Sequence, residues 1–474
     1  MRVIHNQENV FRTEPRRGNG IELTIKFLYI IGYGTKKEQI LLAQIRTSLQ
    51  CPVVITQCRQ RPQDFTRQRL LSFGRLCLVV LRGHKLSFQN ALNKVFHALG
   101  DVFGVPTPSA YSHARQKLKP TVFTHLQRSL SAGFYQLYEA DEQVRRWRGH
   151  RLLATDGTYL TVPDTAETRA QYTVQTNQHA GADCVQAQCG VLYDLRTDLG
   201  LRLHLSARQS ETRVLRDDLW RATQPGDVIV LDRAYADYSL LAYAQAQRRH
   251  LIVRLPRGRF AECEAFWQSH LPEQIVTLAL PKTASTRAFV AQQNLPPKIR
   301  VRLVRVLLSS GEVEVLLTTL GDAHAYPADE FKQVYGARWG EETFFDRFKN
   351  IYEVERFSGT TLAAVEQDIY GLFFLMTFES ILTKPEQAAL AQQGAARATK
   401  FVPQVNRAES YVALLDRVVL LLLSPQDEAT VLAELHHLFG KNPTLQRPGR
   451  QFIRAPLNYS KTVRYLKYRK KVRA

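Results

Sequence analysis

Apolar residues recur at spacings of three and four along residues 70–118, a pattern that predicts amphipathic helices. Ser87 is expected to cap one of these helices and Ser109 to cap the next, which is rich in basic residues. Helix pairs occur in DNA-binding domains and in ordinary bundles, and the basic second helix favours DNA contact. We therefore predict an N-terminal arm over residues 1–39 and a helical DNA-binding domain over residues 40–145.

From residue 146 onward, apolar runs of strand length replace the helical spacing. A strand, an antiparallel meander and a strand–helix–strand unit follow one another, and their expected ranges are 152–162, 174–193, 199–205, 228–232, 239–248 and 251–255. A short run that is apolar throughout is typical of a strand buried on both faces of a sheet. The predicted fold class is therefore α/β and multi-domain, with residues 146–256 as the first part of a mixed sheet flanked by helices.

Residues 257–326 change character again, because several short strands predict a β-rich insertion. Arg300, Arg302 and Arg305 lie on one of these strands, and Trp267 lies near the start of the insertion. Basic and aromatic side chains together fit contact with nucleic acid. An isolated tryptophan, however, is more often part of a hydrophobic core.

Helical spacing resumes in residues 327–385. A wedge of roughly 60° on one face of a single helix is expected to hold Tyr335, Arg338, Glu342 and Lys349. Mixed polar faces of this kind usually do no more than contact water. Here one carboxylate lies between two cations and a phenol, a set suited to holding a metal ion next to phosphate oxygens.

The remaining residues, 386–474, are expected to form a helical C-terminal region with a basic tail. Residues 384–400 are rich in Ala and Gln and are interpreted as a weakly ordered link. After Glu434 the chain has no acidic residue, while Arg and Lys accumulate among tyrosines. A run of charge is usually just solvated, but in an already basic protein we expect this tail to contact phosphates.

Composition narrows the partner. The 474 residues suffice for about three domains. With 64 Lys and Arg against 43 Asp and Glu, the formal net charge is +21, which favours a polyanion, most often nucleic acid and less often a membrane surface. No apolar run approaches the roughly 18 to 20 residues that span a bilayer, and no secretion signal is recognisable. Six cysteines in a chain of this size indicate reduced thiols, so a cytoplasmic protein is expected.

Two aspartates place a charge where the pattern predicts apolar strands. Asp156 interrupts one strand and Asp232 ends another. A lone strand aspartate more often accepts structural hydrogen bonds than binds a cation, whereas a carboxylate at the carboxyl end of a buried strand is a better site candidate. Together with Glu342 they form an Asp, Asp, Glu set that meets the needs of two-metal phosphoryl transfer, for which Mg²⁺ is a suitable ion.

The same residues carry a resemblance to a known family. The spacing Tyr, two residues, Arg, three residues, Glu, six residues, Lys is met by Tyr335, Arg338, Glu342 and Lys349. Asp156 stands in Asp-Gly-Thr and Asp232 in Leu-Asp-Arg-Ala-Tyr. With these motifs, residues 150–385 resemble the DDE transposases of bacterial insertion sequences, in the group named after insertion sequence four. The resemblance implies a ribonuclease H-like catalytic domain whose second part is residues 327–385.

The resemblance also implies a role for each motif residue. Two Mg²⁺ ions, for which Mn²⁺ can substitute, would be bound by Asp156, Asp232 and Glu342. The phosphates of the processed strand would be held by Tyr335, Arg338 and Lys349. Relatives use an aromatic residue of the insertion to stack on a flipped base, and Trp267 is the candidate here.

Partners and reaction steps follow from the resemblance as well. Water would cut a phosphodiester at the transposon end, and the freed 3′-hydroxyl would attack next, in some relatives through a hairpin, before the end is joined to target DNA. Residues 40–145 would then bind the DNA ends. Two chains would pair the ends as a homodimer in a synaptic complex associated with the bacterial nucleoid.

Two other functions remain open at this point. A metal-dependent nuclease or resolvase would need the same three carboxylates, and only hairpin or joined products would separate it from a transposase. A non-catalytic DNA-binding repressor derived from a transposase would not need them, so the intact Asp156, Asp232 and Glu342 disfavour it. Short inverted repeats beside the coding region would favour the transposase over both.

Overall fold

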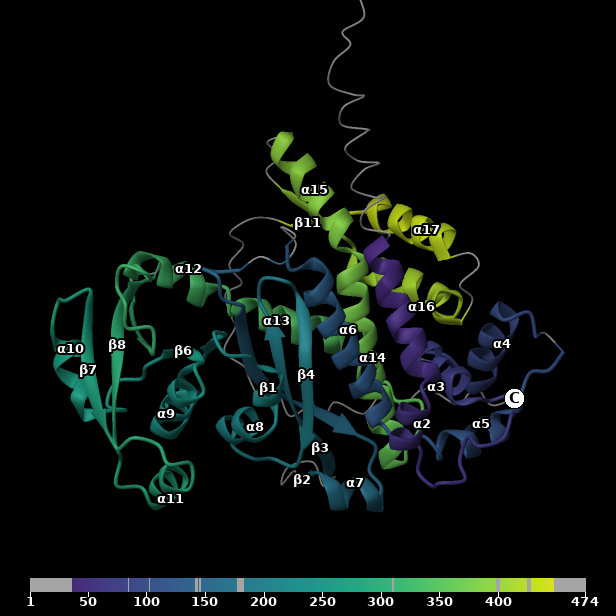
Figure 1. The fold of residues 1–474 in the computed structure, drawn as a ribbon, viewed down its shortest axis with the longest axis horizontal. Coiled ribbons are helices and arrows are strands. Elements are labelled where there is room, and N and C mark those ends of the chain that lie inside the picture. The colour runs from purple at the N-terminus through teal and green to yellow at the C-terminus, as the bar shows by residue number, and fades with distance from the viewer. Residues whose placement is uncertain are drawn as a thin grey trace, which may run out of the picture.

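A computed structural model of the chain describes residues 36–446, apart from 84, 102, 141–143, 145, 177–182, 309–310, 398–400 and 424–427. Most of the predicted arm and the basic tail beyond residue 446 lie outside the described residues. The insertion lies at the left of Figure 1 and helices of both ends of the chain lie at the right, with the central strands between them.

Five strands form the centre of the sheet, in the order β4, β3, β1, β5, β6. The first three are antiparallel to one another, whereas β5 and β6 run parallel to β1. This order and these directions are those of a ribonuclease H-like fold, so the predicted fold class is confirmed. The strands are β1 (Leu152–Val162), β3 (Cys184–Asp194), β4 (Leu199–Ser206), β5 (Val228–Leu231) and β6 (His250–Arg254), with the short β2 (Thr173–Gln175) beside β3.

The insertion extends this sheet instead of forming a sheet of its own. Its last strand pairs antiparallel with β6 and is followed outward by the other two, so that nine strands of the described residues make one sheet. Short helices cover the insertion (Figure 1). Its elements are η3 (Ala261–Cys263), α10 (Glu264–Gln268), β7 (Glu273–Ala279), α11 (Ala284–Gln292), β8 (Lys298–Leu307) and β9 (Val313–Thr318).

Alternate residues of the central strands enter two different cores. Along β5, Val228 and Val230 belong to a smaller cluster with Phe331 of α12, whereas Ile229 and Leu231 belong to the large cluster. The strand is thus buried on both faces, as its uninterrupted apolar run predicts. The connecting helices of this region are α7 (Ala166–Gln171), α8 (Glu211–Asp217), η1 (Leu219–Ala222), η2 (Arg233–Tyr235), α9 (Tyr238–Ala246), η4 (Ala328–Glu330) and α12 (Phe331–Gly336).

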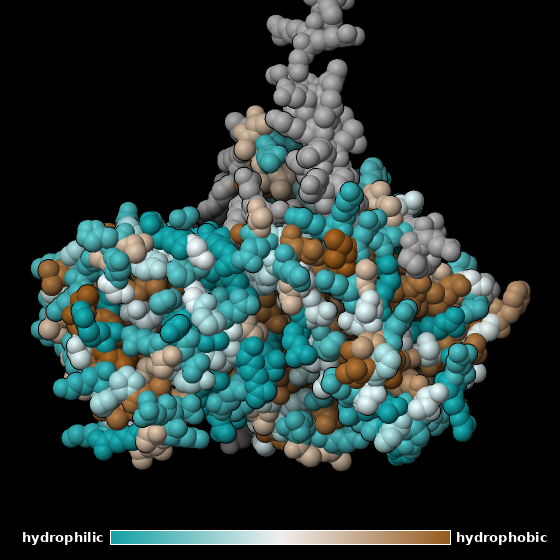
Figure 2. All heavy atoms as spheres, viewed as in Figure 1, coloured by the Kyte–Doolittle hydropathy of each residue, from teal (hydrophilic) through white to brown (hydrophobic). Residues whose placement is uncertain are grey.

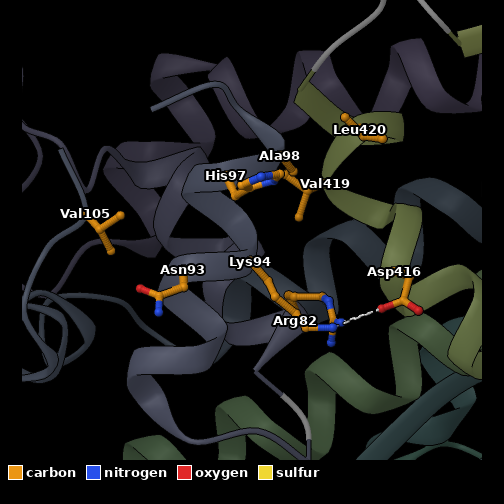
Figure 3. A pocket seen from close by; sticks show the side chains of 9 residues that line it. All are labelled: Arg82, Asn93, Lys94, His97, Ala98, Val105, Asp416, Val419 and Leu420. Atoms are coloured by element: carbon orange, nitrogen blue, oxygen red, sulfur yellow. Dashed lines mark hydrogen bonds and ion pairs between the residues drawn. The ribbon is translucent and has the colours of Figure 1, made fainter. Parts of the chain in front are cut away.

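Helices from both ends of the chain pack together beside the sheet (Figure 1). The long helix α14 contacts α3, α6 and β4, and α16 contacts α3 and α4. Arg82 of α3 pairs with Asp416 of α16 at 2.5 Å, on the wall of a pocket of about 670 Å³ (Figure 3). The helices are residues 36–50, α2 (Pro52–Cys58), α3 (Phe73–Arg82), α4 (Phe88–Ala98), α5 (Pro108–Arg115), α6 (Thr121–Tyr138), α14 (Leu362–Leu382), α16 (Arg407–Leu423) and α17 (Glu428–Lys441).

One of the two predicted caps in the N-terminal helix pair is right. The Ser87 hydroxyl accepts a hydrogen bond from the amide of Asn90 and caps α4. The prediction for Ser109 is wrong, because Thr107 caps α5 and Pro108 takes its first turn. Proline favours the start of a helix, where its missing N–H leaves no hydrogen bond unmade, so the cap falls on the residue before it.

The predicted link over residues 384–400 is also wrong, because α15 (Lys384–Ala396) occupies most of it. Ala, Gln and Glu are strong helix formers, and Pro385 lies in the first turn, where proline is tolerated. Leu390 anchors the helix in the large core. Two short strands, β10 (Val402–Gln404) and β11 (Thr444–Gln446), pair next to it.

Hydrophilic residues cover most of the face shown in Figure 2, and hydrophobic ones gather there only in small groups, one of them over the β7 and β8 end of the sheet. Exposed apolar side chains of that end include Ile275 and Leu307. Over the residues that the structure describes, no helix is both long and apolar enough to cross a membrane.

Candidate active site

Asp156 and Asp232 lie on neighbouring strands of the sheet. The parallel register of β1 and β5 pairs Ala154 with Val230, and each aspartate follows two residues later in the chain. Adjacent strands are roughly 5 Å apart, so the backbones that carry the two carboxylates are direct neighbours. The structure therefore brings together two aspartates that are far apart in the sequence.

Both carboxylates belong to the face of the sheet that α12 covers. Asp156 has the same parity along β1 as Leu152, and Asp232 continues the parity of Val228, both of which lie in the smaller core. The strand β5 ends at Leu231, whereas β1 continues to Val162. The two aspartates thus lie where a buried strand ends beside a longer one, the place at which open α/β sheets present functional groups.

The segment that carries the other motif residues is not the single helix that the sequence predicted. It consists of α12, α13 (Trp339–Asp346) and the π-helical turn η5 (Arg347–Ile351). Between the two α-helices, hydrogen bonds run from Arg338 to Tyr335 and from Gly340 to Ala337, three residues apart instead of four. Glycines at 336 and 340 weaken the α-helix there, which explains the tightened turn. We call residues 331–351 the signature segment.

Glu342 of the signature segment faces the aspartates across α13, which contacts β1. Its carboxylate pairs with Arg338 at 3.3 Å, one helical turn away. Burial raises the pKa of Asp156, and the negative charges of Asp232 and Glu342 raise it further. The Gly157 amide, which donates to Asp156 at 2.8 Å, and Arg338 oppose this rise only in part. The carboxylates are therefore close enough to repel one another.

Tyr335 lies at the rim of the same group. It is 8% exposed and packs into the smaller core, and burial raises the pKa of its phenol, so it stays a hydrogen-bond donor at neutral pH. The Arg338 guanidinium lies over the Tyr335 ring at 5.9 Å and over the Trp339 ring at 5.4 Å. Trp339 is 53% exposed. Its contact with Arg338 was not predicted, because Trp339 is not one of the four motif residues.

A fourth acidic residue, Glu211, was not predicted from the sequence. It begins α8, and burial together with the charges of Asp156 and Asp232 raises its pKa to about 7. A Cβ added at Gly157 would lie 2.7 Å from its carboxylate oxygen. The glycine after Asp156 is thus the signal that could have found it, because a strand position without a side chain leaves room for a neighbouring group.

Lys349 and Trp267 lie elsewhere. Lys349, in η5, donates a hydrogen bond to the Tyr159 carbonyl of β1 at 2.9 Å. Tyr159 lies three residues after Asp156 on the same strand. Trp267 belongs to α10 of the insertion, next to the outer strand β7, and its half-buried ring packs against the large core. Five steps between strands separate β7 from β1, roughly 24 Å along the hydrogen-bonding direction.

Two of the three arginines on β8 whose pattern fits contact with nucleic acid are bound within the protein. Arg302 is 1% exposed and binds Glu273 and the Tyr326 carbonyl. Arg305 donates to three backbone carbonyls that precede β7. The alternation of β8 turns Arg302 inward, and a buried guanidinium needs such partners.

The donor chemistry of the acidic group fits a divalent cation, because carboxylate oxygens are the ligands that Mg²⁺ prefers. Their mutual repulsion is what a bound cation relieves. As they stand, no three His, Cys, Asp or Glu side chains within the described ranges are placed to hold a metal ion. Glu342 contributes the third carboxylate of this group and also pairs with Arg338.

A basic pocket lies in the N-terminal helical region. The pocket, of about 1190 Å³, is formed by the loop before α3, the first turn of α3, the residues before α5, α5 itself and Lys117 after it. Its basic lining residues outnumber the acidic Asp64 and are Arg67, Arg69, Arg75, His113 and Lys117. Such a lining suits an anionic partner.

The chain is similar to known transposases. A family model described as the transposase DDE domain matches residues 147–378. The transposase InsG for insertion sequence element IS4 of Escherichia coli (strain K12) is 27% identical over 271 residues, which are 56% of this chain and 58% of that protein. The matched region thus spans less than two thirds of the relative. A solved structure of the piggyBac transposase synaptic complex with hairpin DNA covers 84% of this chain and 85% of its own, at a TM-score of 0.41 and 9% identity.

Proposed function

Residues 147–378 of this chain match the transposase DDE domain, and on that premise we propose that the chain is a DDE transposase that moves an insertion sequence by cutting the DNA at its ends and joining them to target DNA. Asp156 and Asp232 on adjacent strands, with Glu342 facing them from α13, are the observation that carries the proposal. Like charges at this spacing are unfavourable unless a cation joins them, and phosphoryl transfer uses such a cation.

In this proposal the acidic residues bind metal ions, and Arg338 and Tyr335 bind the phosphate. Asp156, Asp232 and Glu342 hold two Mg²⁺ ions, with Mn²⁺ as a substitute. When bound, the ions supply an activated attacking oxygen and stabilise the departing one. Arg338 releases Glu342 and turns its guanidinium to the phosphate, since the same side chain cannot serve both anions fully. The Tyr335 hydroxyl donates a further hydrogen bond to the phosphate.

Lys349 acts one step farther along the DNA strand. Its ammonium, which the Tyr159 carbonyl holds at 2.9 Å, lies past Asp156 on β1 and reaches a neighbouring phosphate as a flexible point charge. Trp267 remains our candidate for stacking on a base flipped toward the insertion. With its ring half-buried on α10, that role requires DNA to extend from the carboxylates across the sheet to the insertion.

DNA ends are bound, in this proposal, by the N-terminal helical region. Its basic pocket includes Lys117 and His113 of the helix pair that the sequence predicts to contact DNA. Two copies of the chain then hold two ends together as a homodimer. Cleavage frees a 3′-hydroxyl, which closes a hairpin on the transposon end before the end is reopened and joined to the target.

The test uses the full chain, Mg²⁺ and a duplex that carries the inverted-repeat end of the element, labelled on one strand. Hairpin or joined products on a denaturing gel support the proposal. Hydrolysis products alone would instead identify a nuclease or resolvase with the same carboxylates. DNA binding without any cleavage would identify a repressor derived from a transposase.

A further inference from the structure

The helix α8 packs close to the ends of the two aspartate strands and brings one acidic side chain to them. It contacts β1 on one side and η2, which follows Asp232, on the other. Glu211 is its first residue and lies against the backbone of Gly157. Its carboxylate accepts a hydrogen bond from the hydroxyl of Tyr235, which is 1% exposed and belongs to η2. The side chain is therefore fixed in place beside both aspartates.

Glu211 and Glu342 reach the aspartates from opposite faces of the sheet. The position of a Cβ on Gly157 is on the face opposite to the Asp156 side chain, since successive strand residues alternate, and Glu211 occupies that position. The parallel pairing of β1 with β5 stops at Ala154 and Val230, so no β5 residue separates Glu211 from Asp156. The absence of a side chain at Gly157 provides the opening.

A structural ion pair does not account for Glu211. Two other acids of this part of the fold are each paired with an arginine: Asp218, which follows the last residue of α8, pairs with Arg202 at 2.7 Å, and the buried Asp227, which precedes β5, pairs with Arg151 at 2.5 Å. The charges that act on Glu211 are those of Asp156 and Asp232, which have the same sign. A carboxylate held by a tyrosine against two other carboxylates gains stability when a cation joins all of them.

We propose that Glu211 is a fourth carboxylate ligand of the divalent cation that Asp156 and Asp232 hold. The proposal rests on the proposed function for the presence of that cation, and it assigns to α8 a residue outside the Asp, Asp, Glu motif. Glu211 completes the oxygen shell on the α8 side, while Glu342 approaches from the signature segment. The cation is thereby shared by both faces of the sheet.

The experiment measures Mn²⁺ binding to the full chain by calorimetry without DNA, so that its result does not depend on cleavage. Glu211→Gln removes one charge and keeps the shape, and it should weaken Mn²⁺ binding by roughly ten- to hundred-fold. The matched control is Asp217→Asn at the other end of the same helix, where the carboxylate pairs with Arg213 and Arg216. That variant should bind Mn²⁺ as the wild type does.

A second variant guards against misfolding. Glu211→Asp keeps the charge but withdraws the carboxylate by one methylene, and it should weaken Mn²⁺ binding by a smaller factor than Glu211→Gln. Equal affinity of wild type, Glu211→Gln and Glu211→Asp overturns the proposal, and so does a wild type that binds no Mn²⁺. If the variants bind Mn²⁺ more weakly but the wild type neither cuts nor joins DNA, Glu211 is still a metal ligand. That result would reject the transposase function and not the ligand proposal.

Discussion

Two groups of buried and partly buried charges contact the signature segment, and they differ in their balance of positive and negative charge. At its α13 end, Glu342 joins Asp156, Asp232 and Glu211, four acids with Arg338 beside them. At its η5 end, Arg347 joins a balanced group in which Asp198 and Glu379 face two arginines. The contacts of that group are Arg347 to Asp198 at 2.6 Å, Arg407 to Asp198 at 2.7 Å and Arg407 to Glu379 at 2.8 Å.

The balanced group stabilises the folded chain, whereas the acidic group destabilises it. Burial alone would raise the pKa of Asp198, but Arg347 and Arg407 hold it below its usual range, so the charged form is favoured in the folded chain. The pKa of Asp156 is raised, so its charge opposes folding. Opposite charges tie the β3–β4 turn, η5 and α16 together, whereas the like charges repel one another and are the group to which we assign a divalent cation.

The largest effect is expected from removing a carboxylate of the acidic group. Glu342→Gln should abolish DNA cleavage and joining while binding to transposon ends stays nearly intact, because the change removes a proposed metal ligand and no phosphate contact. Cleavage gels and a gel-shift titration measure the two effects. Asp346→Asn, in the exposed last turn of α13, is the control and should remain active. A Glu342→Gln chain that still cuts DNA contradicts the assignment.

The two groups should also respond in opposite ways when the stability of the chain is measured. Asp198→Ala leaves Arg347 and Arg407 buried without their shared carboxylate and should destabilise the chain by about 3–5 kcal/mol. Asp156→Asn removes a charge whose pKa is raised, and therefore should stabilise the metal-free chain at neutral pH. Thermal unfolding in a metal chelator measures both. If both variants melted at the same temperature, the two groups would not differ as described.

A third buried group sharpens the contrast through pH. His436 of α17 lies between Glu38 at 2.9 Å and Glu386 at 2.7 Å, and these carboxylates raise the pKa of the imidazole to about 10 despite its burial. A raised pKa means that the stabilisation is complete below pH 6.5 and is lost as the pH rises through about 10.

His436→Gln should therefore melt at a lower temperature than the wild type at pH 6.5, by about 2 kcal/mol in stability. Between pH 6.5 and 10 its melting temperature should change less than that of the wild type. Melting curves of both chains over this range are the measurement. Parallel curves would show that the imidazole is not charged in the folded protein.

The smallest effect concerns the cation next to the balanced group. Lys349→Ala should weaken DNA binding evenly across sequences and lower the slope of log affinity against log salt by about one, as expected for the loss of one phosphate contact. The control is Lys282→Ala, in an exposed loop of the insertion. A slope that Lys349→Ala leaves unchanged would reduce Lys349 to a structural link with Tyr159.

Local patterns predicted most of the central sheet, because strands buried on both faces leave an uninterrupted apolar run such as residues 228–231. The fixed spacing from Tyr335 to Lys349 predicted a helical segment, and the structure places the α13 part of it against β1. Pairing of β9 with β6 could not be predicted, since strand neighbours that are distant in sequence leave no periodic signal. Glu211 was missed because the aspartates near it are distant in the sequence. The one sequence feature that points to it is the glycine at position 157.

The breaks in the signature segment were missed for a related reason. Side-chain periodicity treats the chain as one regular helix, but Gly336 and Gly340 admit a tighter turn, and η5 adds a wider one where Arg347 is drawn to Asp198. Arg302 shows the same limit, because the sequence marks it as a cation and only the register of β8 turns it into the core.

The antiparallel pairing of β9 with β6 has a consequence for shortened forms of the chain. Without residues 257–326, β6 would present an open row of amide and carbonyl groups on a strand whose Ile252 and Val253 are fully buried in the intact protein. Such an edge is a template for self-association. A chain that lacks the insertion is therefore expected to self-associate through β6, so the insertion also protects this edge of the sheet.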